Sequence, residues 1–173
     1  MSLGSNKFKI IRGLLQGELL EFLGIYACNA EIFNASENRG HMDKQIPNTP
    51  AWYDDLAMKN LMCYLCPHIE KYTGEKLIAA YSYLRVYKKG DELKRHIDRN
   101  LCEFSVSLTL RRDHKDDIWP IYLESDKIYK ISLEAGDGLI YKGIESPHWR
   151  GKFEGERLAQ VFLHYLSREK INV

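Results

Sequence analysis

The sequence is short of the features that mark a secreted, membrane-spanning or nucleic-acid-binding protein. Its 173 residues include four cysteines, too few and too unevenly spread for a disulfide framework, so we expect reduced thiols. No apolar run approaches the length of a membrane span, and the N-terminus lacks a charged segment leading into a continuous apolar core. Basic and acidic side chains nearly cancel, 25 against 24, which gives no general attraction to nucleic acid or membrane. We therefore expect a cytoplasmic protein whose selectivity comes from a local site.

Cys63 and Cys66 form a CxxC pair. Such a pair is half of a zinc site or a redox motif, but no second CxxC and no suitably spaced Cys/His partner set completes it. We interpret both cysteines as packing residues of a helix.

The length suits a single domain, 1–173, and the hydrophobic pattern changes near residue 76. Before that point, apolar residues recur at the period of two amphipathic helices, with a polar segment, 34–50, between them. Pro47 and Pro50 indicate that this segment is a loop and that the second helix starts near Ala51. The loop is equally compatible with a functional flap and with a plain connector.

From residue 76 onward the pattern has the period of two that is typical of strands. In the stretch 104–110, apolar residues occupy one face, while Ser105, Ser107 and Thr109 occupy the other and could line a polar cavity. Further short strands separated by turns follow up to residue 165. We expect an α+β, mainly β protein: a double-stranded β-helix, or jelly roll, at about 76–168, supported by a helical segment at about 6–75.

His96, Asp98 and His148 are the candidate metal ligands. Two imidazoles and one carboxylate are the ligand set of a mononuclear non-haem iron(II) site, which leaves coordination positions open for substrate and O₂. If the HxD segment is extended, residues two apart project from the same side, so His96 and Asp98 reach toward one point and a distant strand supplies the third ligand. An HxD pair alone is weak evidence. The turn 136–138 ahead of His148, and Arg157 after it, strengthen the prediction.

With these elements in this order, residues 77–165 resemble the Fe(II)- and 2-oxoglutarate-dependent dioxygenases, particularly the prolyl-4-hydroxylase-like branch. That family carries an HxD pair near the end of one strand, a second histidine after a GD-containing turn, and a basic residue further on. The resemblance implies that His96, Asp98 and His148 bind Fe(II), while 2-oxoglutarate chelates the same ion. Arg157 would then hold the far carboxylate of 2-oxoglutarate, a task that suits a planar guanidinium.

The resemblance also implies cosubstrate contacts for Tyr87, on the strand before the HxD segment, and for Thr109 and Ser107 on the next strand. Relatives can have a tyrosine on that next strand and, outside the prolyl-hydroxylase branch, a serine where this sequence has Ala159. These departures put more weight on Tyr87, for which packing and cosubstrate binding are equally good interpretations.

Aromatic and arginine side chains expected near the metal are the candidates for a substrate pocket, because such pockets combine apolar walls with a few directional polar groups. They are Tyr83, Arg85, Arg99, Trp119 and Trp149. Each is also compatible with simple packing. The remaining histidines are interpreted as structural or solvated: His41, His68, His114 and His164.

The resemblance thus implies an oxidoreductase that hydroxylates a C–H bond of a small-molecule or peptidyl substrate, consuming O₂ and releasing succinate and CO₂. It suggests a prolyl residue of a peptide or protein as the substrate and ascorbate as a candidate reductant. The alternative is a cupin-like module that binds a metal or small ligand without oxygen chemistry. Arg157 and Tyr87 favour the enzyme, and nothing in the sequence indicates a nucleic-acid or membrane partner.

Overall fold

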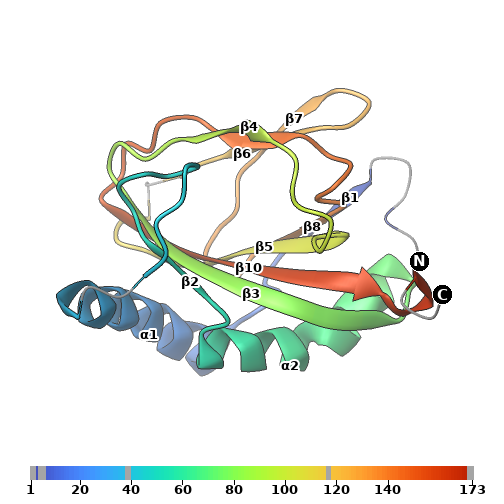
Figure 1. The fold of residues 1–173 in the computed structure, drawn as a ribbon, viewed down its shortest axis with the longest axis horizontal. Coiled ribbons are helices and arrows are strands. Elements are labelled where there is room, and N and C mark those ends of the chain that lie inside the picture. The colour runs from blue at the N-terminus through green and yellow to red at the C-terminus, as the bar shows by residue number, and fades with distance from the viewer. Residues whose placement is uncertain (1–2, 4–6, 38–39, 116–117, 171–173) are drawn as a thin grey trace.

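The computed structural model describes residues 3, 7–37, 40–115 and 118–170. Two antiparallel sheets face each other, and two helices cover the outer face of the larger sheet (Figure 1). The major sheet has the strand order β1-β8-β5-β10-β3-β2, and the minor sheet has the order β4-β9-β6-β7. This double-sheet arrangement confirms the predicted, mainly β jelly roll with helical support.

The ten strands of the described residues are divided between the two sheets. The major sheet consists of β1 (Phe8–Ile11), β2 (Ala51–Tyr53), β3 (Leu77–Lys88), β5 (Phe104–Arg112), β8 (Gly138–Tyr141) and β10 (Arg157–Ser167). The minor sheet consists of β4 (Leu93–His96), β6 (Ile121–Glu124), β7 (Ile128–Ile131) and β9 (His148–Arg150). The helices are α1 (Gly17–Ser36) and α2 (Leu56–Thr73), followed at the C-terminus by a 3₁₀ turn, Arg168–Lys170. Neither α1 nor α2 is long and apolar enough to span a membrane.

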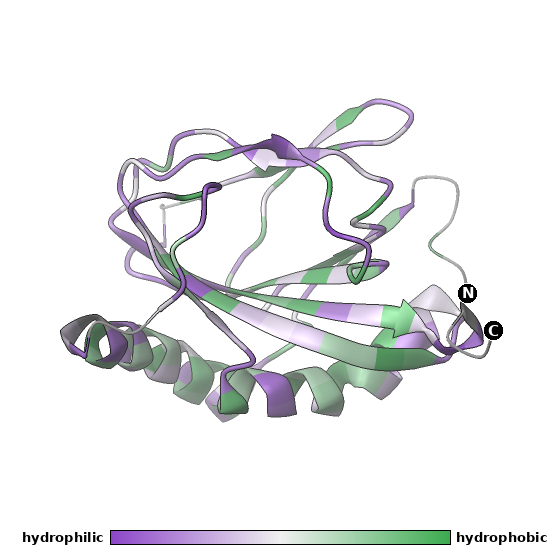
Figure 2. Ribbon diagram, in the orientation of Figure 1, coloured by the Kyte–Doolittle hydropathy of each residue, from purple (hydrophilic) through white to green (hydrophobic). Residues whose placement is uncertain are grey.

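The second helix starts later than its sequence pattern predicts. The carboxylate of Asp55 accepts hydrogen bonds from the first-turn N–H groups of Ala57 and Met58, which caps α2 at Leu56. The expected start near Ala51 is wrong, because residues 51–53 instead form β2 and pair with β3. Both helices carry hydrophilic and hydrophobic residues (Figure 2). α2 buries one apolar face, as its sequence pattern predicts, whereas α1 also exposes large apolar side chains such as Phe22 and Phe33.

The segment 6–75, which we expected to be helical, also contributes a strand at the edge of the major sheet. This strand, β1, pairs with β8. Asp137, in the turn before β8, holds the end of this strand. Its carboxylate accepts hydrogen bonds from the N–H groups of Gly13 (2.9 Å) and Glu134 (2.9 Å) and from the Arg12 guanidinium. The predicted turn thus anchors the N-terminal segment to the sheet.

Both faces of β10 are buried, but against different partners. Ala159, Val161 and Leu163 belong to the hydrophobic core between the major sheet and the helices. Leu158 and Phe162 belong to a second core that lies between the two sheets. Successive side chains of a strand point to opposite faces, so β10 divides its residues between the helix side and the space that contains the site.

Replacing Asp137 by alanine removes the shared acceptor of three hydrogen bonds, one of them from the charged guanidinium of Arg12. We expect the free energy of unfolding to fall by about 2–4 kcal/mol, measured by urea denaturation. Asp126→Ala is the matched control, since it removes an exposed hydrogen bond from Tyr129, and it should cost less than about 0.5 kcal/mol. Equal losses in the two variants would contradict the anchoring role of Asp137.

Candidate metal centre

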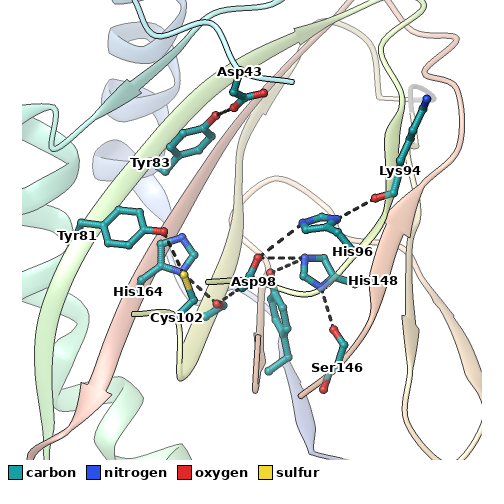
Figure 3. A network of polar contacts seen from close by, with 12 residues as sticks. Asp43, Tyr81, Tyr83, Lys94, His96, Asp98, Cys102, Ser146, His148 and His164 are labelled. Atoms are coloured by element: carbon teal, nitrogen blue, oxygen red, sulfur yellow. Dashed lines mark hydrogen bonds and ion pairs between the residues drawn. The ribbon is translucent and has the colours of Figure 1, made fainter. Parts of the chain in front are cut away.

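Two short strands of the minor sheet bring the predicted ligands together. His96 of β4 lies directly opposite His148 of β9, and their ring centroids are 4.3 Å apart. Asp98 follows the end of β4, and its N–H donates to the carbonyl of Gly143 at 2.9 Å. Figure 3 shows the carboxylate and the two imidazoles pointing toward one another from segments that are far apart in the sequence.

The spacing of the three groups leaves room for one ion. Oδ1 of Asp98 lies 3.6 Å from Nε2 of His96 and 3.6 Å from Nε2 of His148. One ligand atom from each residue lies within 4.8 Å of the others. Adjacent octahedral ligands about 2.1 Å from an ion are about 3 Å apart, so the group needs only a small contraction to close around a metal.

The imidazoles are oriented as a metal site requires. Nδ1 of His96 is 2.8 Å from the carbonyl of Lys94, and Nδ1 of His148 is 2.9 Å from the carbonyl of Ser146. A carbonyl can only accept, so each Nδ1 carries the proton. The lone pair of each Nε2 is therefore free to face Asp98, which is the neutral tautomer that binds metals.

Asp98 is fixed by its surroundings as well. Its Oδ2 accepts a hydrogen bond from the hydroxyl of Ser105 (2.8 Å), which itself lies 3.0 Å from Nδ1 of His164. A Cβ atom at Gly143 would lie 2.2 Å from Oδ2 of Asp98 and 2.5 Å from the Ser105 oxygen. The carboxylate thus fits only beside a glycine, and Oδ1 is the oxygen left for a metal.

The protonation states also suit a cation. Burial opposes ionisation of Asp98, but the adjacent His96 side chain, the nearby His148 and His164, and the Ser105 hydroxyl outweigh it and lower its pKa to about 2. Burial lowers the pKa of His148. Burial also acts to lower the pKa of His96, but the contact with Asp98 raises it overall. The site thus consists of one ionised carboxylate and two imidazoles. Of the two imidazoles, that of His96 binds a proton more readily than that of His148.

A cavity opens beside this group, between the two sheets. Side chains of β3 and β10 form much of its wall: Tyr81, Tyr83, Arg85, Tyr87, Phe162 and His164. The predicted pocket residues Tyr83 and Arg85, the predicted cosubstrate residue Tyr87, and Arg99 thus all line the cavity.

The loop between the helices contributes to the same cavity. Asp43 accepts hydrogen bonds from Arg85 (2.7 Å) and from the hydroxyl of Tyr83, as Figure 3 shows for the tyrosine. Gln45 lines the cavity, and Ile46 is buried in the core between the sheets. Residues 38–39 of the polar segment lie outside the described residues. Among the described residues of the segment, Gln45 lines the cavity and Asp43 holds Arg85 and Tyr83 of its wall, whereas residues 34–36 belong to the end of α1.

Two other sets of predicted residues lie apart from the cavity lining. The hydroxyl of Thr109 donates to Oε1 of Gln160 (3.0 Å), and the amide of Gln160 donates to the Ser107 hydroxyl (2.8 Å), so both hydroxyls already have partners between the sheets. Trp119 is buried behind Tyr87, with ring centroids 4.8 Å apart. Trp149 stacks on Tyr122 at 5.5 Å, on the face of the minor sheet that points away from the site, because its neighbours His148 and Arg150 occupy the inner face.

Arg157 is not where the sequence pattern placed it. It shares the helix-side face of β10 with Ala159, and its Nε lies 3.4 Å from the carboxylate of Asp113. Cys28 and Glu31 of α1 also act on its guanidinium and help to raise its pKa, although burial opposes this. The predicted contact with the cosubstrate therefore does not fit this position, since the sheet itself separates Arg157 from the metal ligands.

Several further residues near the site had no role or a different role in the sequence analysis. His164, interpreted as structural or solvated, is buried beside Asp98, and Cys102 forms a second possible metal-binding group with these two residues. The hydroxyl of Tyr81 lies 3.0 Å from the Cys102 sulfur. Arg150, two residues after His148, is buried between the sheets. One signal in the sequence could have pointed to Arg150. Residues two apart on a strand point to the same face, so Arg150 shares the face of the predicted ligand His148.

No protein-family model and no curated protein matches the sequence. Several solved structures, however, match the fold of this chain. A prolyl-4-hydroxylase of Pseudomonas putida superposes with a TM-score of 0.73 at 15% identity, covering 96% of this chain and 95% of that one. A prolyl hydroxylase of Trichoplax adhaerens, solved with a hypoxia-inducible-factor peptide fragment, gives a TM-score of 0.70 at 17% identity, covering 97% and 87%.

HygX of Streptomyces hygroscopicus, solved with nickel, 2-oxoglutarate and hygromycin B, gives a TM-score of 0.67 at 13% identity, covering 96% of this chain and 85% of that one. At these identities the similarity establishes the fold. The class is therefore the jelly roll of the prolyl-4-hydroxylases and other 2-oxoglutarate-dependent oxygenases, as the sequence resemblance implied.

Gly143→Ala tests the fit of the carboxylate. The added methyl group would occupy the position of Asp98 Oδ2 and push the carboxylate away from the imidazoles. We expect the affinity for a divalent metal to fall by about 10-fold or more, measured by isothermal titration with Mn(II). Gly151→Ala is the control, since a Cβ there meets nothing within 4 Å, and it should bind as the wild type does. Unchanged affinity in Gly143→Ala would show that Asp98 is not a ligand.

Metal binding should weaken in acid. A proton on either Nε2 competes with the ion, and His96, with its raised pKa, takes up the first proton as the pH falls. We expect the affinity to be constant above that pKa and to fall by about 10-fold per pH unit below it. Equilibrium dialysis at a series of pH values measures the occupancy, and full occupancy throughout would contradict binding by His96.

Proposed function

We propose that the protein is an Fe(II)- and 2-oxoglutarate-dependent oxygenase that oxidises a C–H bond. The observation that carries this proposal is the convergence of two Nε2 atoms on one carboxylate oxygen, with both Nδ1 protons held by backbone carbonyls. Two histidines and one carboxylate with open positions are the ligand set of non-haem Fe(II) oxygenases. The fold, shared with structures such as the nickel and 2-oxoglutarate complex of HygX, supports the same assignment.

The chain's own residues have separate tasks in such a reaction. His96, His148 and Asp98 hold the ion, and the hydroxyl of Ser105 holds Asp98. Bound Fe(II) and 2-oxoglutarate would supply the oxidising chemistry, with O₂ consumed and succinate and CO₂ released. Tyr81, Tyr83 and Tyr87 of β3 form part of the cavity wall in which a substrate would be positioned beside the ion.

The substrate is proposed as a peptide or a small molecule. Similar structures include one bound to a peptide fragment and one bound to hygromycin B, so the fold accommodates both classes. A prolyl residue remains the first choice for a peptide substrate. Ascorbate as a reductant and a cytoplasmic location remain predictions.

Succinate formation tests the proposed activity and separates it from a cupin-like binding module. Protein, Fe(II), 2-oxoglutarate and O₂ are incubated without a prime substrate, because uncoupled turnover requires none. We expect the wild type to form succinate and Asp98→Ala to lose about 100-fold or more of this rate, since the variant lacks one of three ligands. Asp126→Ala, which alters a surface carboxylate, should retain it. Tight 2-oxoglutarate binding without succinate would favour the binding module.

A further inference from the structure

Arg150 is a buried arginine whose hydrogen bonds are incomplete. Its side chain lies between the sheets with 2% of its surface exposed, and its guanidinium lies over the Trp119 ring at 4.9 Å. Nη1 donates to the carbonyl of Trp119, but Nε and Nη2 have no partner among the described residues. No carboxylate in the described part of the chain forms an ion pair with it.

Such an arrangement is unfavourable in the absence of an anion. Burial of an unpaired charge carries a large desolvation cost, and buried charges in proteins are normally paired. Arginine side chains remain protonated in proteins, so Arg150 carries its positive charge at neutral pH. The guanidinium therefore presents a positive charge in a space that the chain itself leaves without a counter-charge.

The two unpaired atoms form one edge of the guanidinium. N–H bonds of Nε and Nη2 point in parallel, which is the geometry that grips both oxygens of a carboxylate. The atom that is already used, Nη1, lies outside this edge. Arg150 thus has a complete bidentate carboxylate site available.

The position of Arg150 relates this site to the metal centre. It follows His148 by two residues on β9, so both side chains project from the same side, with Cα atoms about 6.6 Å apart. Its cross-strand partner is Leu93, which lines the cavity, and so do Tyr87 and Tyr141, the two groups that act electrostatically on Arg150. A carboxylate held by Arg150 would therefore lie on the same side of β9 as the metal ligand His148, next to side chains that line the cavity.

Other arginines fit this task less well. Arg85 already forms an ion pair with Asp43, so its charge has a partner within the chain and does not require a carboxylate from a ligand. Arg157 lies on the helix side of β10 next to Asp113. On the cavity side, the residue adjoining Arg157 is Leu158, which packs in the core with Tyr87 and Trp119 and has no group that binds a carboxylate.

We propose that Arg150 binds the far carboxylate of 2-oxoglutarate, the role that the sequence resemblance assigned to Arg157. This inference rests on the proposed function. It moves the anchor from the last strand of the major sheet to β9, the strand that carries His148.

The test compares two ligands that chelate a metal alike. 2-Oxoglutarate and 2-oxopentanoate share the 2-oxo acid end, but the second has a methyl group in place of the far carboxylate. Affinities are measured by isothermal titration of the Mn(II)-loaded protein without O₂. We expect the wild type to prefer 2-oxoglutarate by about 100-fold or more, and Arg150→Met to reduce this preference to about 3-fold or less. Arg157→Met, the matched control, should keep the wild-type preference.

Each outcome decides the inference. A full preference for 2-oxoglutarate in Arg150→Met, or its loss in Arg157→Met, would overturn it while leaving the proposed function in place. If the Mn(II)-loaded wild type bound neither ligand, the proposed function itself would fail. Should Arg150→Met not fold, Arg150→Lys provides the same comparison, because lysine keeps the charge but loses the two-pronged edge and should reduce the preference by about 10-fold.

Discussion

The pairing of β4 with β9 is the constraint on which the site depends. It places His96 directly opposite His148, and the continuation of β4 then delivers Asp98 to the same point. A shift of this register by one residue would turn an imidazole to the opposite face of the minor sheet. The backbone carbonyls that hold the Nδ1 protons belong to residues two positions before each histidine, so strand register and ligand orientation are determined together.

The major sheet separates two environments that serve different purposes. Its helix side is an apolar core with α1 and α2, which supplies stability. Its inner side carries buried polar groups that an ordinary core would exclude, among them Arg85, Gln160 and His164. Concentrating such groups in one layer is costly for folding, and it is typical of a binding site rather than of a structural core.

The sequence allowed the jelly roll and the meeting of His96, Asp98 and His148 to be predicted, because strand alternation and the order of the HxD pair, the turn 136–138 and the second histidine can be read along the chain. The face of Arg157 could not be predicted in this way. Alternation correctly places Arg157 and His164 on opposite faces of β10, but both faces are buried, so hydrophobicity does not tell which one faces the metal. The strand β1 and the late start of α2 depend on partners remote in sequence, β8 and β3, and only tertiary pairing reveals them.

X-ray absorption of the Fe(II)-loaded protein measures the ligands most directly. Among the described residues, two adjacent groups could hold the ion: His96 with Asp98 and His148, or Asp98 with Cys102 and His164. Our account predicts a shell of nitrogen and oxygen atoms alone, at about 2.0–2.2 Å, with the scattering pattern of two imidazoles. A sulfur ligand at about 2.3 Å would place the iron on Cys102 and contradict the account.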